Sequence, residues 1–442
     1  AGNQMSRRST FMFGNTIPRS PTAHVGSGLG PGLPQGTISL IAPTEEISGR
    51  GTQRVIDGVT FEFIDAAGTE APAEFMFYLP EKRALCTAEV VTATFHNLLT
   101  PRGAKVRDAL GWSRAIDYVL ETYGDKADVV FASHHWPTWG EENVDTLLEG
   151  QRDIYRYVHD QTLRNANAGA TMTEAAEAVT EPAFESKPDA FNTRGYYGTL
   201  NHNAKAVYQY YFGWWGGVPA EYYELPHVVT AARYVDAMGG LDATLAVGAK
   251  AFEAGDYRWA AEVFNHAVFA EPESETARNW LAATYEQLGF QAESGAWRSY
   301  FLVGASELRN GIPSLGNPQL GNPEFLRAVK SIDLMDSLAA RFNPAKMTAE
   351  PFAVNLVFPD RDEALTLHLG KSVLVPREGS VEDAAVTLTM DRSVFDLVLL
   401  GRTTLPEQLQ SGAATVSGNP AMLQAFFGTL DRPDFWFPVV TP

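Results

Sequence analysis

The sequence predicts a multidomain protein that passes from α/β to all-α and then to α+β organisation. Its 442 residues are too many for one ordinary hydrophobic core, so two or three domains are expected. Up to residue 140 the apolar residues recur first with strand-like and then with helical spacing, and from 141 to 310 the spacing is helical. Beyond a Gly/Pro/Asn-rich stretch, the pattern becomes a mixture of both.

The composition excludes several classes of protein. Apolar residues make up 45% of the chain and charged residues 20%, which is typical of globular proteins. The formal charge of −19 argues against nucleic acid or anionic lipid as a partner, because both need a basic face. We predict no membrane span, since no apolar run reaches the required length of about 18 residues. The single cysteine, Cys86, excludes an intrachain disulfide.

The first domain is predicted to span residues 1–140. Residues 1–45 are rich in Gly, Pro, Ser and Arg and are expected to form irregular surface loops. The stretches TISLIA, RVIDGVTFEFIDA, AEFMFYLP and RALCTAE read as strands, with a hairpin turn at Asp57-Gly58. Helical spacing predicts a helix over 102–123, and ADVVFASHHWP reads as a strand that ends in a polar loop. Such an alternation predicts an α/β layer with functional groups at strand ends.

The middle segment, 141–310, is predicted to be helical. Gly255 and Gly289 lie 34 residues apart, each in a stretch that reads as a helix, a turn at glycine and a second helix. This is the period of tetratricopeptide units. Fewer than three clear repeats would not stand alone. We therefore expect this domain to pack against another surface, that of a second subunit.

The last segment is predicted to be a compact α+β domain over 326–442, after a linker at 311–325. SIDLMDSLAARF reads as a helix, and FAVNLVFP, ALTLHLGKSVLVP and AAVTLTMD read as three strands. VFDLVLLG and AMLQAFFGTL read as helices. No catalytic constellation is evident in this segment.

Candidate metal ligands lie near strand ends in the first domain. Glu70 and Glu89 follow strand-like runs, and His134-His135 ends another. Carboxylate oxygen together with imidazole nitrogen suits zinc or another first-row divalent ion. The alternative for each residue alone is a surface carboxylate or a structural histidine.

Candidate anion ligands follow Glu89 in the stretch CTAEVVTATFHNLLTPRG. Asn97 and Arg102 are hydrogen-bond donors, and the fork of an arginine matches sulfate, phosphate or carboxylate oxygens. Arg102 is predicted to open the helix, whose N-terminal amides favour anions. The alternative is a helix-start arginine in a surface ion pair. His96, between these residues, is expected to be structural.

Several long motifs identify a family. TEAPAE, CTAE, HNLLTPRGAKVRDALGW, FASHHWPTWG, QRDIYRYVHDQTLR and RGYYGTLNHNAKAVYQ together resemble the alkylsulfatases of the metallo-β-lactamase superfamily. The resemblance implies a metallo-β-lactamase-like αββα domain, a helical dimerisation domain and a C-terminal domain like sterol carrier protein 2. The first of these, over 1–140, would be incomplete. A homodimer and a periplasmic or secreted location are also implied.

The resemblance assigns roles to particular residues. Glu70, Glu89 and His134 match zinc ligands, with Glu89 bridging two zinc ions. Asn97, Arg102 and Tyr208 match sulfate-binding positions, and His202 is a candidate proton donor. An alkyl tail could contact Trp136, Trp139 and the aromatic run 208–215, although core packing is the alternative for that run.

One departure from the family concerns the first metal motif, HxHxDH, which this sequence does not contain. The resemblance implies that AGNQMSRR corresponds to the segment that follows that motif. Three ligands then remain where two zinc ions need roughly seven. We therefore expect this chain to begin inside the catalytic domain, with HxHxDH either on a separate N-terminal fragment or on a segment that this sequence omits.

The predicted function is zinc-dependent hydrolysis of alkyl sulfates such as dodecyl sulfate, a detergent-degrading activity. Zinc-activated water would attack carbon, and the products would be an alcohol and inorganic sulfate. One alternative is another metallo-β-lactamase-type hydrolase, such as a phosphatase or thioesterase, which the long HNLLTPRG motif disfavours. The other is a metal-free lipid-binding or assembly protein built from tetratricopeptide-like and sterol-carrier-like modules.

Overall fold

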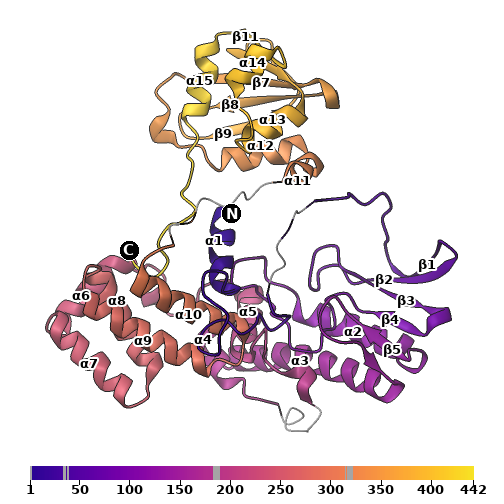
Figure 1. The fold of residues 1–442 in the computed structure, drawn as a ribbon, viewed down its shortest axis with the longest axis vertical. Helices are drawn as coiled ribbons and strands as arrows, with labels where there is room; N and C mark the ends of the chain where they lie inside the picture. Colours follow the sequence, from indigo (N-terminus) through magenta and orange to yellow (C-terminus); the bar gives the residue numbers. More distant parts are fainter. Residues whose placement is uncertain (1, 33–35, 37–38, 183–189, 314, 316–321) are drawn as a thin grey trace. The chain divides into compact units, whose positions relative to one another are not determined.

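The computed structural model describes residues 2–32, 36, 39–182, 190–313, 315 and 322–442. The chain forms two compact units (Figure 1). The first comprises Ala1–Pro34, Glu46–Leu315 and Trp436–Pro442, so it contains both the strand-rich and the helical segments. The second comprises Gln35–Glu45 and Gly316–Phe435.

The first unit contains a six-stranded sheet whose strands follow one another in sequence order. All neighbouring strands are antiparallel except β4 and β5, which are parallel. Asp57 and Gly58 both have positive φ and form the predicted hairpin turn between β1 and β2. The strands are β1 (Arg50–Ile56), β2 (Val59–Asp65), β3 (Phe75–Leu79), β4 (Ala84–Cys86), β5 (Val129–Phe131) and β6 (Thr138–Trp139).

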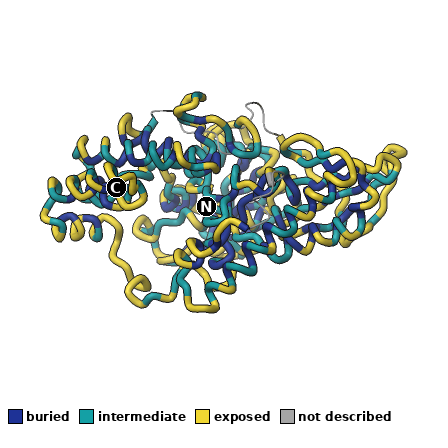
Figure 2. Tube along the Cα trace, turned by 90° about the horizontal axis from the view of Figure 1, so that it is seen from below, coloured by how far each residue is buried: buried dark blue, intermediate teal, exposed yellow. Residues whose placement is uncertain are grey.

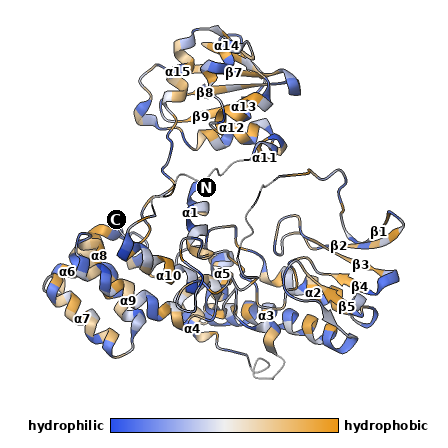
Figure 3. Ribbon diagram, in the orientation of Figure 1, coloured by the Kyte–Doolittle hydropathy of each residue, from blue (hydrophilic) through white to orange (hydrophobic). Residues whose placement is uncertain are grey.

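Two long helices, α2 (Ala109–Tyr123) and α3 (Glu141–Asn167), form one core with the sheet. Trp112 of α2 stacks on Tyr155 of α3 with ring centroids 4.5 Å apart, and both side chains are fully buried. Figure 3 shows how hydrophobic strands β3, β4 and β5 are, as burial against helices requires. This core fixes the strand ends that carry the candidate metal ligands.

Three predictions for the first 125 residues are wrong in detail. Residues 2–12, expected to be irregular, form α1 (Gly2–Met12). Phe11 and Met12 of this helix are buried, and Arg7 forms a buried ion pair with Glu307 at 2.7 Å. The stretch expected as a first strand forms none over residues 39–42, and Thr37 and Ile38 lie outside the described residues. The helix expected from Arg102 begins only at Ala109, after the N-cap Asp108.

The helical segment is a succession of antiparallel helices, with its core residues along the inner faces (Figure 2). Gly255 forms the turn between α7 and α8, with φ of +77°. Gly289 does not form a turn: it lies inside α9, where a Cβ would come within 2.8 Å of Leu302. The helices are α4 (Met172–Ala178), α5 (Leu200–Phe212), α6 (His227–Ala237), α7 (Leu241–Glu253), α8 (Tyr257–Ala270), α9 (Glu275–Gln291) and α10 (Gly295–Asn310).

The second unit is an α+β domain built on a five-stranded sheet in the order β11-β10-β7-β8-β9. The stretch expected as one strand, ALTLHLGKSVLVP, forms two, and β11 was not predicted. The strands are β7 (Phe352–Phe358), β8 (Glu363–Leu369), β9 (Leu374–Glu378), β10 (Val386–Met390) and β11 (Ala414–Gly418). The helices are α11 (Pro323–Ala328), α12 (Ser331–Ala339), α13 (Arg392–Leu399), α14 (Leu405–Ser411) and α15 (Pro420–Gly428).

A buried arginine ties the start of the second unit to its core. Arg392 donates hydrogen bonds to Asp396 at 2.8 Å, to the Ser331 hydroxyl at 2.7 Å and to the Leu326 carbonyl at 2.6 Å. Its charge is thus paired and hydrogen-bonded, as burial demands. In the part of the chain that the structure describes, no helix is both long and apolar enough to cross a bilayer.

Candidate metal and anion site

Glu89 lies between two histidines at one edge of the first sheet. The Nε2 atom of His134 is 3.0 Å from Glu89 Oε1, and Nε2 of His96 is 3.6 Å from Glu89 Oε2. Glu89 follows β4, and His134 follows β5. Because β4 and β5 are parallel, their carboxyl ends meet at the same edge. Backbone hydrogen bonds from Thr87 to Phe131 and from Ser133 to Ala88 continue that pairing into the site.

Glu70 completes a cluster of potential metal ligands. Ligand atoms of Glu70, Glu89 and His96 all lie within 4.8 Å of one another. Two carboxylates and an imidazole at this spacing, with His134 beside them, form a donor set that fits a first-row divalent cation. Glu70, Glu89 and His134 are thus brought together as predicted from the motifs. His96, expected to be structural, lies within the cluster itself.

Neighbouring charges and burial shift the pKa values of the residues in this cluster in different directions. Hydrogen bonds from His134 and His96 hold the pKa of Glu89 far below its ordinary value. The same Glu89 carboxylate raises the pKa of His134. Glu74 accepts a hydrogen bond from the Glu89 amide at 3.2 Å, and burial raises the pKa of Glu74. A nearby cation, either a charged side chain or a bound metal ion, stabilises a cluster that is rich in carboxylates.

The anion-binding candidates lie directly beyond this cluster. The amide nitrogen of Asn97 is buried and has no hydrogen-bond partner among the described residues. Its Oδ1 accepts hydrogen bonds from Arg107 at 3.0 Å and from the Thr100 hydroxyl at 3.4 Å. A buried donor without a partner costs about 1–3 kcal/mol, so an oxyanion that accepts from it gains correspondingly.

Arg102 is a second candidate anion ligand with unused hydrogen-bond donors. Its one described hydrogen bond runs to the Gly103 carbonyl at 3.3 Å, and no ion pair joins it to a carboxylate of the described chain. Since α2 begins seven residues later, Arg102 does not open that helix, and helix-terminal amides take no part here. Anion binding at this site therefore depends on side chains.

The loop His96–Pro101, which carries Asn97 and directly precedes Arg102, is held by hydrogen bonds to its backbone carbonyls. Each of its six carbonyl oxygens accepts a hydrogen bond within the chain, as buried carbonyls outside regular secondary structure require. The donors, in order from His96 to Pro101, are Asn203 Nδ2, Arg107 Nη1, the Arg107 amide, His202 Nε2, the Gly103 amide and, at Pro101, both Arg8 and the Tyr300 hydroxyl. Helices α1, α5 and α10 thus fix the loop.

Two residues assigned from the motifs lie elsewhere than expected. His202 donates its Nε2 proton to the Leu99 carbonyl, and burial lowers the pKa of its imidazole. Its described role is therefore to hold the loop as a neutral ring. The hydroxyl of Tyr208 faces the Gly216 carbonyl at 3.5 Å, and its ring packs on Phe212 at 4.8 Å.

Tyr197, and not Tyr208, is the tyrosine of this motif whose ring lies against that of His96. The two ring centroids are 4.8 Å apart, and burial raises the pKa of the Tyr197 hydroxyl. Sequence reasoning also missed Arg107 and Asn203, although both stand in the quoted motifs. In each case the signal available in the sequence was a polar residue directly next to an apolar one.

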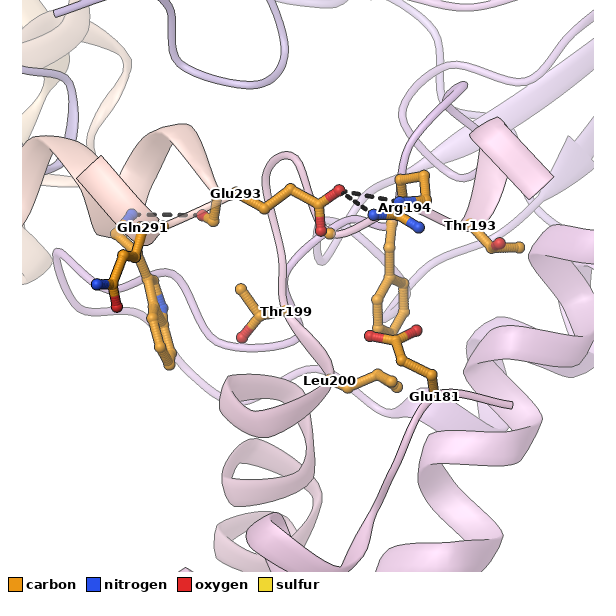
Figure 4. A pocket seen from close by; sticks show the side chains of 12 residues that line it. Glu181, Thr193, Arg194, Thr199, Leu200, Gln291 and Glu293 are labelled. Carbon is orange, nitrogen blue, oxygen red and sulfur yellow. Dashed lines mark hydrogen bonds and ion pairs between the residues drawn. The ribbon is translucent and has the colours of Figure 1, made fainter. Parts of the chain in front are cut away.

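A separate pocket lies behind the loop. Arg194 and Glu293 form an ion pair of 2.6 Å across its wall, and Glu181 lies opposite (Figure 4). The Phe95 amide donates to the Arg194 carbonyl at 2.9 Å, so the pocket backs onto the segment that precedes His96. None of the candidate metal or anion ligands lines it. Trp136 and Trp139, the candidate contacts for an alkyl tail, do not line this pocket either. Both are exposed, and they follow His134 in sequence.

A cluster of carboxylates and histidines, beside a loop that offers hydrogen-bond donors to an anion, is typical of a metal-dependent hydrolase. Two family models match: alkyl sulfatase dimerisation over residues 171–311 and alkyl sulfatase C-terminal over 319–442. The chain belongs to the alkylsulfatase family, which confirms the resemblance seen in its motifs.

Individual relatives agree with this assignment. A linear primary-alkylsulfatase of Pseudomonas sp is 44% identical over all of this chain and 65% of its own length. The alkyl/aryl-sulfatase BDS1 of Saccharomyces cerevisiae is 41% identical over 100% of the chain and 68% of its own. The solved structure of the inverting sec-alkylsulfatase Pisa1 from Pseudomonas sp. superposes with a TM-score of 0.94 at 38% identity, covering 100% of this chain and 70% of that one. The chain thus spans about two thirds of the length of its curated relatives.

Removal of the Asn203 side chain tests the support of the loop. Asn203→Ala leaves the His96 carbonyl and the Leu98 amide buried without partners. We expect the free energy of unfolding to fall by about 2–3 kcal/mol, and the Leu98 amide to exchange faster with deuterium. Urea unfolding and hydrogen exchange measure the two effects. Asn201→Ala, on the same helix but paired with an exposed Glu177, is the control. Equal effects of the two variants would contradict this role.

The Glu89–His134 pair predicts a pH dependence of stability in the metal-free protein. The lowered pKa of Glu89 gives a contribution present above its ordinary value of 4.5 and lost as pH falls through the folded pKa. The raised pKa of His134 gives a contribution present below 6.5 and lost as pH rises through its folded pKa. Both are present together between those values.

Glu89→Gln should therefore lower the melting temperature more at about pH 5.5 than at about pH 9, where His134 is neutral in both states. Thermal unfolding with a metal chelator present at both pH values measures the difference. His266→Gln, at an imidazole far from the cluster in sequence and without a carboxylate hydrogen bond among the described contacts, is the matched control. A pH-independent effect of Glu89→Gln would show that the pair carries no charge.

Proposed function

We propose that this protein hydrolyses alkyl sulfate esters, such as dodecyl sulfate, to an alcohol and inorganic sulfate. The observation that carries the proposal is the buried amide nitrogen of Asn97, which has no hydrogen-bond partner among the described residues, together with an Arg102 that forms no ion pair with a described carboxylate. Arg107 links Asn97 to the Glu70–Glu89–His96 cluster, because it donates to Asn97 and His96 and forms an ion pair with Glu70. The names of the relatives, all alkylsulfatases or alkyl/aryl-sulfatases, support the same substrate class.

The chain's own residues would bind and orient the sulfate group. Asn97 donates one hydrogen bond, and the Arg102 guanidinium offers a planar fork that matches two sulfate oxygens. Charge accumulates on the sulfate oxygens as the ester bond to carbon breaks. Donors fixed in advance, on a loop whose carbonyls are all hydrogen-bonded, stabilise that charge without reorganisation.

Zinc is the proposed metal, with two ions per site. Glu70, Glu89 and His134 would hold it, and His96 is a further imidazole within reach of both carboxylates. When bound, zinc supplies Lewis-acid activation of water near neutral pH. These four side chains are too few for two ions at roughly four ligands each. The remaining ligands are proposed to come from polypeptide outside this chain that carries the HxHxDH motif.

The sheet offers a surface for such polypeptide. Ile64, Met76 and Tyr78 face the helices, so the intervening residues of β2 and β3 face the opposite side. That side carries a cluster of phenylalanine rings with centroids 5.3–6.2 Å apart, and Phe75 is 43% exposed. The cluster consists of Phe61, Phe63, Phe75, Phe77 and Phe131. An apolar face of this kind supports packing of a second β-layer.

A homodimer is the proposed assembly. The family model matched over 171–311 is that of alkyl sulfatase dimerisation. Within this range, large apolar side chains are exposed around α6 and the loop before it, including Tyr223 at 96%. Exposed aromatic residues in such a group are typical of a protein–protein interface. The others are Trp214, Tyr222, Leu225, Val228, Val229 and Tyr234.

The activity is tested on the intact, zinc-loaded protein with dodecyl sulfate. We expect release of inorganic sulfate, and in ¹⁸O-labelled water we expect the label in the alcohol because the C–O bond breaks. Asn97→Ala should lower kcat/KM by about 10²–10³-fold, as for removal of one preorganised donor, and Glu89→Gln should abolish turnover and lower the zinc content. Asn201→Ala serves as the control with unchanged activity. Full activity of Asn97→Ala would overturn the proposal.

The assembly is tested by mass spectrometry of an active preparation. Under native conditions we expect two copies of this chain. Denaturing conditions should show polypeptide containing HxHxDH, either continuous with this chain or separate from it. Tyr223→Asp places a charge on the exposed aromatic surface and should shift the native mass to that of one copy. An active preparation without HxHxDH, or a monomeric wild type, would contradict the corresponding proposal.

A further inference from the structure

Arg107 lies between the metal half and the anion half of the candidate site. Its Nη1 donates to the Asn97 side-chain oxygen at 3.0 Å, to the Asn97 carbonyl at 2.7 Å and to His96 Nδ1 at 3.2 Å. Its Nη2 forms an ion pair with Glu70. The side chain is 13% exposed, and its guanidinium lies 5.9 Å from the ring centroid of buried Trp112. One side chain thus contacts a candidate metal ligand and a candidate anion ligand.

The contact with Asn97 decides which way its amide points. A guanidinium can only donate hydrogen bonds, and of the two ends of an amide only the oxygen can accept them. Arg107 therefore draws Oδ1 of Asn97 toward itself, with the Thr100 hydroxyl as a second donor. The Nδ2 end must then point away from Arg107, and this is the buried nitrogen without a partner.

The contact with Glu70 acts on the other half of the site. Arg107 occupies one carboxylate oxygen of Glu70, which leaves the second oxygen for another partner. The positive charge also lowers the cost of holding Glu70 near Glu74, because the charges of Glu70 and Glu89 contribute to the raised pKa of Glu74 and that of Arg107 opposes them. The same guanidinium holds both partners at once because its donors form a rigid fork.

We propose that Arg107 is a positioning residue that orients the Asn97 amide toward sulfate and holds the Glu70 carboxylate beside it. This inference rests on the proposed function. In this role Arg107 acts through Asn97 and not by contact with sulfate, since both of its terminal nitrogens already donate to Glu70, Asn97 and His96. An arginine at this position therefore makes sulfate affinity depend on the geometry of the fork and not only on its charge.

Arg107→Lys is the decisive variant, since it keeps the positive charge near Glu70 but cannot reach Asn97 and Glu70 together. We expect unchanged zinc content and a Kd for inorganic sulfate raised about tenfold or more, the value of one hydrogen bond to a charged group. The Kd is measured on the intact protein by calorimetry or by the melting-temperature shift that sulfate causes. Arg83→Lys, at an exposed Arg83–Asp128 pair, is the matched control and should leave both quantities unchanged.

A double-mutant cycle distinguishes positioning from general support of the fold. If Arg107 acts through Asn97, Arg107→Lys should weaken sulfate binding in the wild type but change it less than twofold in an Asn97→Ala background. Arg107→Gln, which retains an amide donor for Asn97 but no charge, should lose zinc more than it loses sulfate. This second variant keeps the test valid where the lysine variant fails to fold.

The possible results separate the two proposals. Wild-type protein that binds no sulfate would overturn the proposed function and this inference with it. Wild-type protein that binds sulfate, with Arg107→Lys binding it equally well, would overturn the inference alone. The inference also fails where Arg107→Lys and Asn97→Ala weaken sulfate binding additively, because independent effects mean that Arg107 does not act through the amide.

Discussion

The whole site depends on the immobilisation of one irregular loop, His96–Pro101, through its backbone carbonyls. A loop without regular structure pays conformational entropy of about 1–2 kcal/mol per ordered residue, so it becomes rigid only where tertiary contacts compensate. Here six consecutive carbonyls accept hydrogen bonds, and most of the donors are side chains from other elements. The result is a short backbone segment that presents the Asn97 amide in one fixed direction.

The metal half of the site is organised differently, by the sheet. Glu89 and His134 are 45 residues apart in sequence, yet the parallel pairing of β4 and β5 brings their side chains to 3.0 Å. Charge then determines the local arrangement. The carboxylates of Glu70, Glu74 and Glu89 repel one another, and the cationic groups of Arg107 and His134 offset that repulsion. The two halves meet at Arg107, which among the described residues is the one that contacts both Glu70 and Asn97.

Sequence motifs predicted the residues whose role depends on local spacing and missed those whose role depends on tertiary contacts. Glu70, Glu89, His134 and Asn97 stand in long motifs and were found. The start of α2 was misplaced because the apolar residues before Ala109 continue the helical spacing, although Asp108 is the cap. Tyr197 and Tyr208 lie eleven residues apart in one motif, and only the fold decides which ring reaches His96. Likewise α1 was missed, because its stability comes from burial of Phe11 and the Arg7–Glu307 pair and not from helix propensity.

The helical region also supports the candidate site. Asn203 and His202 on α5 hold the carbonyls of His96 and Leu99, and Tyr300 on α10 holds that of Pro101. The loop His96–Pro101 is therefore supported by helices that lie within the residues matched by the dimerisation family model. These side chains come from helices outside the sheet. Without those helices, the carbonyls of His96, Leu99 and Pro101 would hydrogen-bond to water, and the Asn97 amide would have no fixed direction. This physical dependence explains why the strand-rich and helical segments form one compact unit here, although the sequence pattern suggests a boundary between them.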